Sequence, residues 1–242
     1  AAAAIAAVAL LALNWPTIWS HNKNGTLQKY SEWLAESLPN TTAVVFSDDK
    51  QQPLLAKAAL ADNAAITDHV FVHTYRLGDP DYQQILSELY GERWPAIRKE
   101  AVVENYIDDI HLIAQADDLV KNGRLYYLHF SFGYFFERLY PKLTGSIFQM
   151  LLYPKDQETL DRPALNPDEM VRIEGIAERL QNEFLPLVKN GPDLDKSGFP
   201  DTAYVARWLS RKINTMGLVL QRNEKKQSAQ RFFSLACQLY DG

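Results

Sequence analysis

The sequence has few of the residues and motifs that usually identify an enzyme or a disulfide-stabilised protein. It has one cysteine, Cys237, so no disulfide can form within the 242-residue chain. It has no excess of positive charge: 25 Lys and Arg residues against 30 Asp and Glu leave a net charge of −5, and we expect no nucleic-acid partner. It also lacks G-x-S-x-G, H-E-x-x-H and glycine-rich phosphate-binding motifs. We therefore assign no catalytic residue, no metal site and no cofactor.

The chain also lacks an apolar run of the roughly 18–20 residues needed to cross a bilayer. Residues 1–13 contain no polar side chain, and Trp15 and Trp19 follow before a polar segment. This pattern is compatible with a signal-peptide core, a buried helix or the end of a transmembrane helix. We favour the end of a transmembrane helix over residues 1–19, because tryptophans are typical of the membrane–water interface. The chain would then be anchored in a membrane through its N-terminal helix.

The remaining residues fit a globular protein, since 47% of the chain is hydrophobic and 23% is charged. Between residues 20 and 155, short β-rich apolar runs alternate with helical patterns. We expect strands at 42–46, 69–75, 124–130 and 146–152, and helices at 26–38, 54–60, 80–89 and 95–121. Asp79 is placed to cap the third of these helices, with Pro80 as its first residue. The alternation predicts an α/β domain, with a small parallel-type sheet and flanking helices.

From Asn166 onward every pattern is helical on both sides of a linker at 191–200, so we expect residues 156–242 to form an all-α domain. In the last helical pair, four residues fall at the spacing of the small and aromatic packing residues of a tetratricopeptide repeat: Gly217, Ala229, Phe233 and Ala236. Small residues there let two antiparallel helices approach closely beside the aromatic ring. An arbitrary helical hairpin with an alanine-rich seam is the alternative. Cys237 lies on the same seam, and we expect it to be buried as a small hydrophobic residue.

One group of polar residues stands where an α/β sheet usually binds its ligands. Ser47, Asp48 and Asp49 directly follow the first predicted strand, His73 lies near the end of the second, and Asp79 follows it. Because loops at the carboxyl ends of parallel strands form ligand sites, these residues are candidates for holding a divalent ion, a nucleotide ribose or a sugar phosphate. Ser47, Asp48 and Asp49 are also the residue types that cap a helix, so a structural role is the alternative.

Aromatic residues are concentrated between residues 126 and 140. The rings belong to Tyr126, Tyr127, Phe130, Phe132, Tyr134, Phe135 and Phe136. Such a density is compatible with a stacking platform for sugar rings or with a docking face on a membrane. A strand and a following segment packed in the core would give the same pattern.

These aromatic residues also carry a resemblance to a known family. The sequence Tyr-Tyr-Leu at 126–128, then Ser-Phe-Gly-Tyr-Phe-Phe-Glu at 131–137 and Leu-Leu-Tyr-Pro at 151–154, resembles the soluble C-terminal region of bacterial multi-pass membrane proteins grouped with protein O-mannosyltransferases. The segment Ala-Val-Val-Phe-Ser-Asp-Asp at 43–49 is similar to the first strand and loop of that region. The resemblance implies a glycosyltransferase-type membrane domain followed by an extracytoplasmic α/β region and tetratricopeptide repeats. It assigns the family's presumed catalytic carboxylates to the membrane domain.

Three functions are therefore open. The resemblance implies an extracytoplasmic accessory region of a membrane-bound glycosyltransferase-like protein, which positions an acceptor or partner protein. The loop at Ser47–Asp49 alternatively predicts a domain that binds a nucleotide or a sugar phosphate. The helical repeat pattern alternatively predicts a protein-interaction module of a membrane assembly, binding its partner protein through the repeats.

Overall fold

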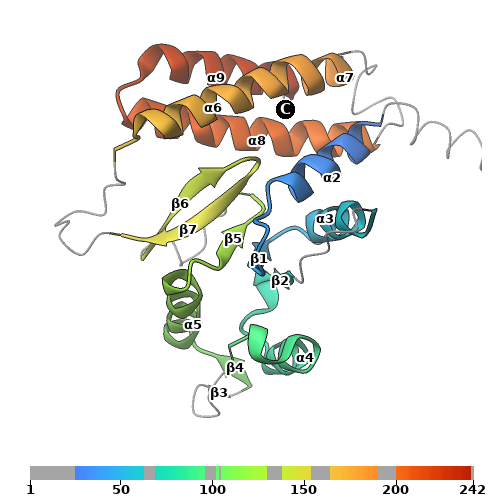
Figure 1. Cartoon of the computed structure of the whole chain (residues 1–242), viewed down its shortest axis with the longest axis vertical. Coiled ribbons are helices and arrows are strands. Elements are labelled where there is room, and N and C mark those ends of the chain that lie inside the picture. Colours follow the sequence, from blue (N-terminus) through green and yellow to red (C-terminus); the bar gives the residue numbers. More distant parts are fainter. Residues whose placement is uncertain are drawn as a thin grey trace, which may run out of the picture. The chain divides into compact units, whose positions relative to one another are not determined.

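A computed structural model describes residues 25–62, 69–95, 102–103, 105–129, 138–153, 164–189 and 200–240 (Figure 1). These residues belong to two compact units. Residues 31–173 form the sheet unit, and residues up to Tyr30 together with Glu174–Gly242 form the helical unit. The expected membrane helix at residues 1–19 lies outside the described residues. Among the helices that the structure does describe, none has the length and apolar character needed to span a bilayer.

The sheet unit combines strands with helices, as the alternating pattern predicts. Two helices, α2 and α6, each have one half in this unit and the other half in the helical unit. The elements in chain order are α2 (Thr26–Glu36), β1 (Val44–Ser47), α3 (Gln51–Asp62), β2 (Val70–His73), η1 (Thr74–Arg76), α4 (Pro80–Tyr90), η2 (Gly91–Arg93), β3 (Val102–Val103), β4 (Tyr106–Ile107), α5 (Asp109–Lys121), β5 (Leu125–Tyr127), β6 (Leu139–Thr144), β7 (Ile147–Leu152) and α6 (Pro167–Arg179).

The main sheet has five strands in the order β2-β1-β5-β7-β6. Strand β1 is parallel to β2 and β5, whereas β7 is antiparallel to both β5 and β6. The α/β class is therefore confirmed, and the sheet is mixed rather than wholly parallel. The cause is the turn at Gly145-Ser146, because two residues can join antiparallel neighbours but cannot make the crossover that parallel strands require. Gly145 has φ 59°, in the left-handed region that favours glycine.

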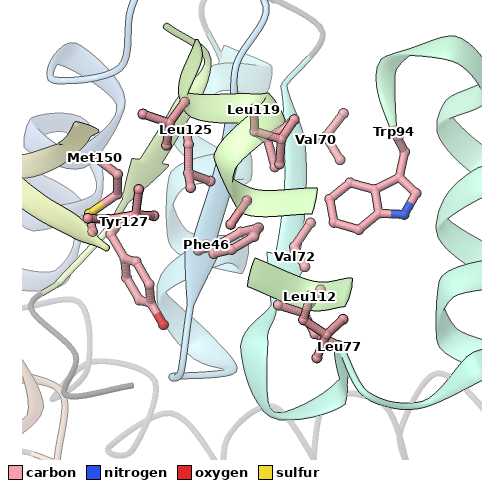
Figure 2. Close-up of a cluster of buried hydrophobic side chains, with 14 of the residues drawn as sticks. Phe46, Val70, Val72, Leu77, Trp94, Leu112, Leu119, Leu125, Tyr127 and Met150 are labelled. Carbon is pink, nitrogen blue, oxygen red and sulfur yellow. The ribbon is translucent and has the colours of Figure 1, made fainter. Parts of the chain in front are cut away.

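One face of this sheet packs against α4, α5 and the indole of Trp94. Figure 2 shows Phe46 and Val72 of neighbouring strands among the side chains that fill this layer. The opposite face is covered as well, since the ammonium group of Lys57 in α3 lies 5.3 Å from the ring centroid of Phe71 in β2. All four residues of β1 are buried, as expected for a central strand covered on both faces. The carboxyl end of β1 is thus held in a fixed position.

The predicted helix over residues 95–121 is wrong at the described residues between 102 and 107. Strands β3 and β4 form a short antiparallel pair there, and Asn105 turns the chain between them with φ 65°. Asparagine tolerates this left-handed conformation better than most residues. Helix α5 begins only at Asp109, because the Asp108 side chain caps it by accepting a hydrogen bond of 2.9 Å from the backbone N–H of His111. The apolar spacing that suggests a longer helix partly reflects Ile107, which is buried in β4.

The described part of the helical unit after α6 contains a π-helical turn, η5 (Leu180–Phe184), and three helices. These are α7 (Leu185–Lys189), α8 (Pro200–Arg222) and α9 (Lys226–Leu239). Helices α8 and α9 pack side by side as a hairpin (Figure 1). The turn between them is closed by a 3.0 Å hydrogen bond from the Lys225 N–H to the carbonyl of Leu220.

The expectation that Cys237 is buried is wrong: Cys237 is exposed, because the neighbouring Ala236 faces the helix interface.

Candidate functional site

The carboxyl ends of β1, β2 and β5 bring several polar residues together. The chain leaves β1 through α3 to reach β2 on one side, and it later returns to pair β5 with the other side of β1. The carboxyl ends of β1 and β5 are therefore a topological switch point, where ligands of open α/β sheets usually bind. The residues gathered there, which we call the Asp48 cluster, are Ser47, Asp48, Asp49, Thr74, Tyr127 and His129.

The Asp48 carboxylate links the three parallel strands. Its Oδ1 atom accepts hydrogen bonds from the hydroxyl groups of Thr74 and Tyr127. The Thr74 hydroxyl also lies 3.2 Å from the carbonyl oxygen of Ser47. The Tyr127 side chain is 2% exposed, and its ring makes an edge contact with the ring of Phe46 at 5.9 Å. Oδ1 is thus fully used within the protein.

Ser47 and His129 are within hydrogen-bond distance, but their geometry is that of a structural pair. The Ser47 Oγ atom lies 3.2 Å from His129 Nε2. His129 Nε2 accepts a 3.0 Å hydrogen bond from the backbone N–H of Asp48, so it is the unprotonated nitrogen of the imidazole. Ser47 is 0% exposed, and its hydroxyl donates to the carbonyl of Asp49 at 2.9 Å. A nucleophilic serine needs access to a substrate, and Ser47 has none.

Asp49 begins the helix that follows β1. Its Oδ1 atom accepts hydrogen bonds from the backbone N–H groups of Gln51 at 2.7 Å and Gln52 at 2.9 Å. These two donors have no partner within the helix, so the carboxylate satisfies them and complements the positive end of the helix dipole. Asp49 is a helix cap in this structure, and Asp48 is the carboxylate that faces the switch point.

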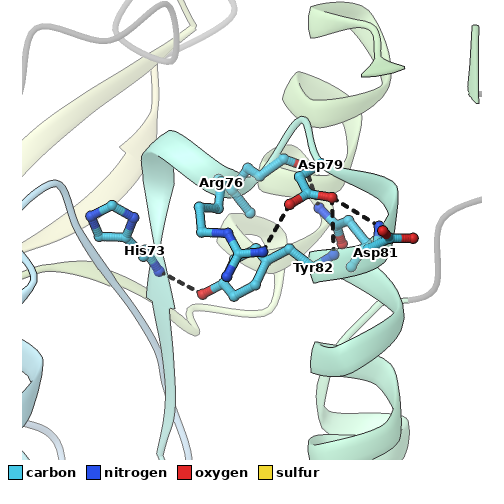
Figure 3. A network of polar contacts seen from close by, with 7 residues as sticks. His73, Arg76, Asp79, Asp81 and Tyr82 are labelled. Carbon is cyan, nitrogen blue, oxygen red and sulfur yellow. Dashed lines mark hydrogen bonds and ion pairs between the residues drawn. The ribbon is translucent and has the colours of Figure 1, made fainter. Parts of the chain in front are cut away.

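His73 and Asp79 are not part of the Asp48 cluster. The backbone N–H of His73 donates a 2.9 Å hydrogen bond to the Tyr82 hydroxyl (Figure 3). The imidazole ring of His73 lies 5.8 Å from the ring of Tyr75, measured between centroids. Asp79 caps α4 by accepting from the backbone N–H groups of Asp81 and Tyr82, as its position before Pro80 predicts. Its other carboxylate oxygen pairs with Arg76 at 2.8 Å.

The electrostatics of this second network agree with a structural role. The hydrogen bond from Arg76 is the main reason why the pKa of the Asp79 carboxyl lies below its ordinary value, although partial desolvation opposes the shift. Burial raises the pKa of the Tyr82 hydroxyl, so that group remains a neutral hydrogen-bonding partner. The arginine also lies over the Tyr82 ring, 4.6 Å from its centroid. The network fixes the loop after β2 and leaves little of Asp79 for a ligand.

One oxygen of the Asp48 cluster, the Oδ2 atom of Asp48, remains available to bind a ligand. Asp48 is partly exposed, and in the described part of the chain its Oδ2 atom makes no hydrogen bond or ion pair. Such an oxygen can accept a hydrogen bond from a ligand hydroxyl or contribute one ligand to a divalent cation. The described residues contain no group of three or more His, Cys, Asp and Glu side chains placed to hold a metal ion.

The structure describes two of the seven aromatic residues named from the sequence, Tyr126 and Tyr127. Tyr126 lies in β5 with 8% of its surface exposed, and burial raises the pKa of its hydroxyl. It is therefore part of the packed sheet and offers no stacking platform. Phe132, Tyr134 and Phe135 lie outside the described residues.

The four residues selected for repeat packing meet at the interface of α8 and α9. A Cβ atom added to Gly217 would lie 2.5 Å from Phe233 Cε1, so the ring rests directly on the glycine. Ala229 and Ala236 are buried on the facing side of α9. The glycine and the alanines therefore allow the two helices to approach closely.

Lys212 is a buried cation in the helical unit that the sequence reasoning did not select. It is 2% exposed, and burial lowers the pKa of its amine from 10.5 to about 7. The Nζ atom lies 5.7 Å from the ring centroid of Tyr30, a cation–π contact that favours the charged amine and offsets part of this effect. A signal was present in the sequence, because Lys212 stands three residues after Leu209 and four before Met216, on the apolar face of α8.

No protein-family model matches the chain, and no curated protein or solved structure is detectably similar to it. The function is therefore argued from the residues and contacts described above.

Proposed function

We propose that this chain is the extracytoplasmic accessory region of a membrane-bound glycosyltransferase-like protein related to protein O-mannosyltransferases. In this proposal, residues 1–19 end a membrane helix, and the following domains lie on the extracytoplasmic side. The tetratricopeptide-like helices hold the acceptor or partner protein, while the chemistry belongs to the membrane domain. The sequence motifs around Phe46 and Tyr127 support the relationship, and the order of an α/β unit before helices is the order that the resemblance implies.

The contact between Gly217 and Phe233 is the observation that carries this proposal. A tetratricopeptide repeat packs two antiparallel helices through small residues at fixed positions and fills the space beside them with an aromatic ring. Gly217, Ala229, Phe233 and Ala236 occupy those positions in sequence, and the ring contacts the glycine in space. Repeats of this kind present extended surfaces that bind other proteins. A protein-binding role for α8 and α9 is therefore favoured over a purely internal one.

The test is sugar transfer by the intact membrane protein that contains this region. Membranes carrying the wild-type protein receive a radiolabelled, lipid-linked mannose donor and either a folded acceptor protein or a short Ser/Thr peptide. We expect transfer to both acceptors. The variant Gly217→Leu, which forces a side chain into Phe233, should lose transfer to the folded protein and keep transfer to the peptide. The control variant Gly175→Leu should behave as the wild type, because a Cβ at Gly175 meets nothing within 4 Å.

Two results would refute this proposal. If the wild-type protein transfers sugar to neither acceptor, the transferase relationship is wrong. If Gly217→Leu reduces transfer to the peptide and to the folded protein equally, the helical region does not act by positioning the acceptor.

A second candidate function is the binding of a nucleotide or a sugar phosphate at the Asp48 cluster. The observation that favours it is the open Oδ2 atom of Asp48 at the switch point of the sheet. Calorimetry of the intact chain with GDP-mannose and Mg²⁺ or Mn²⁺ tests it. Binding that is lost in Asp48→Asn would support a ligand site. The absence of heat with the wild-type chain would eliminate this candidate.

A further inference from the structure

Helix α8 carries a single carboxylate, that of Asp201 in its first turn, and none over the rest of its length. Six residues on one face of α8 recur at intervals of three or four positions, which keeps them within a sector of about 80° around the helix axis. All are partly or fully exposed, and we call them the α8 stripe: Tyr204, Trp208, Arg211, Thr215, Leu218 and Arg222. At 1.5 Å per residue the stripe is about 27 Å long. It lies opposite the helix face that carries Leu209, Ile213 and Leu220, which are fully buried.

Helices α8 and α9 are basic, although the chain as a whole is acidic. Residues 200–240 contain seven Lys and Arg, including the buried Lys212, against two Asp and Glu, a formal net charge of +5. The whole chain has −5, so all other residues together carry −10. Charge that is concentrated in this way gives one element an electrostatic preference opposite to that of the rest of the protein. The preference of α8 and α9 is for an acidic partner.

The cations of the stripe are available for such a partner. Arg211 and Arg222 are both exposed, and in the part of the chain that the structure describes their guanidinium groups form no hydrogen bond or ion pair. The guanidinium carbon of Arg211 lies 5.3 Å from the ring centroid of Trp208. A guanidinium held over an aromatic ring keeps its N–H groups at the edge, where they can bind a carboxylate through two hydrogen bonds.

The aromatic rings of the stripe are held in place by each other and by the arginine. The rings of Tyr204 and Trp208 meet edge to face at 6.4 Å. Both residues are only partly exposed, and Leu218 is the most exposed apolar residue of the stripe, with 40% of its surface open to solvent. A surface that enters a bilayer needs several projecting apolar side chains. A protein segment with carboxylates and a few apolar side chains matches the stripe better.

We propose that the α8 stripe binds an acidic protein segment, with carboxylates at Arg211 and Arg222 and an apolar side chain against Leu218. This inference rests on the proposed function, because it specifies the chemistry of the partner that the helical region would hold. Arg211 and Arg222 are eleven residues apart, which corresponds to about 16 Å along α8. A helical partner that meets both arginines therefore carries acidic residues eleven positions apart, with apolar residues between them.

The magnitude of the effect follows from the number of contacts removed. An exposed ion pair contributes little by itself, and reversing a charge replaces an attraction by a repulsion. Arg211→Glu combined with Arg222→Glu should therefore weaken binding by about tenfold. Loss of a central tryptophan commonly has a larger effect, so Trp208→Ala should weaken binding by roughly tenfold or more. Lys225→Glu combined with Lys226→Glu changes the net charge equally at the start of α9, outside the stripe, and it should change affinity less than about twofold.

The experiment measures fluorescence anisotropy of a labelled, helical 20-residue peptide added to the intact chain. The peptide has Glu residues eleven positions apart with Leu residues between them, and a control peptide has the same composition in scrambled order. We expect the ordered peptide to bind the wild-type chain at least tenfold more tightly than the scrambled one. The Arg211/Arg222 variant should lose this binding, the Lys225/Lys226 variant should keep it, and circular dichroism should show equal helix content in both.

Four outcomes would overturn the inference. Equal loss in the Arg211/Arg222 and Lys225/Lys226 variants would mean that net charge alone attracts the peptide. Equal affinity for the scrambled peptide, or no binding of either peptide, would mean that the stripe does not recognise this pattern. Binding to vesicles of phosphatidylglycerol without binding to the peptide would assign the stripe to a membrane surface. The assay involves no sugar transfer, so its failure is distinguishable from a failure of the transferase relationship.

Discussion

The substitution Gly217→Ala tests whether α8 and α9 approach each other closely at Gly217. The proposed function depends on this close packing. The added Cβ atom would lie 2.5 Å from Cε1 and 2.7 Å from Cδ1 of Phe233, well inside van der Waals contact. The ring cannot withdraw freely, because Phe233 is partly buried and attached to a packed helix. We therefore expect the two helices to separate slightly or the ring to leave its preferred rotamer.

The expected free energy combines two opposing effects. Replacing glycine by alanine inside a helix stabilises that helix by about 0.8–1 kcal/mol. Forcing an extra carbon into a packed interface costs about 1–3 kcal/mol. Gly175→Ala in α6 has the first effect without the second, because a Cβ there meets nothing within 4 Å. The Gly217 variant should therefore be about 1–3 kcal/mol less stable than the Gly175 variant.

Urea unfolding of the intact chain, followed by circular dichroism, measures this difference. Hydrogen exchange followed by mass spectrometry then localises it, and faster exchange should be confined to α8 and α9. Phe233→Leu removes the ring atoms nearest to the new methyl group, so the double variant with Gly217→Ala should recover part of the lost stability. If both glycine variants stabilise the chain equally, the close contact does not exist and the repeat-like packing is wrong.

Three further predictions follow from single contacts. The pKa of buried Lys212 is about 7 in the folded chain and near 10.5 in the unfolded chain, so the unfolded state binds more protons between these values. The free energy of unfolding should rise between pH 7 and pH 10 by up to roughly 1.4 kcal/mol per pH unit, and Lys212→Met should remove this rise in urea titrations. Asp79→Ala should lower the thermal midpoint because α4 loses its cap, and the difference should disappear at acidic pH, once the Asp79 carboxyl is protonated below its lowered pKa. Tyr127→Phe removes one of the two hydroxyl donors to Asp48 and should cost about 0.5–1.5 kcal/mol in urea unfolding, whereas no change would mean that the Asp48 cluster does not hold the strands together.

The sequence predicts a helix or strand correctly where the residue pattern of the segment itself matches the burial and capping that the segment has in the fold. Strands β1, β2 and β5 are short apolar runs, and Asp79 followed by Pro80 is a strong local signal for the start of α4. Strand β6 gives a weak signal, because Pro141 and Lys142 interrupt its apolar residues. It lies at the edge of the sheet, where a proline is tolerated.

Only half of the residues of the Asp48 cluster can be predicted from the sequence. Ser47, Asp48 and Asp49 are adjacent and directly follow a strand, so local reasoning finds them. Their partners Thr74, Tyr127 and His129 are 26, 79 and 81 residues away from Asp48. Their proximity depends on the strand order β2-β1-β5, which an alternation of strands and helices does not specify.

The measurement that tests the central claim most directly is sugar transfer by the intact membrane protein with the stripe variants. Transfer from the lipid-linked mannose donor is compared between a folded acceptor protein and a short Ser/Thr peptide. We predict that Arg211→Glu combined with Arg222→Glu slows transfer to the folded protein by about tenfold and leaves transfer to the peptide unchanged, whereas Lys225→Glu combined with Lys226→Glu affects neither. Unchanged transfer to the folded protein in the Arg211/Arg222 variant would contradict the claim that α8 positions the acceptor.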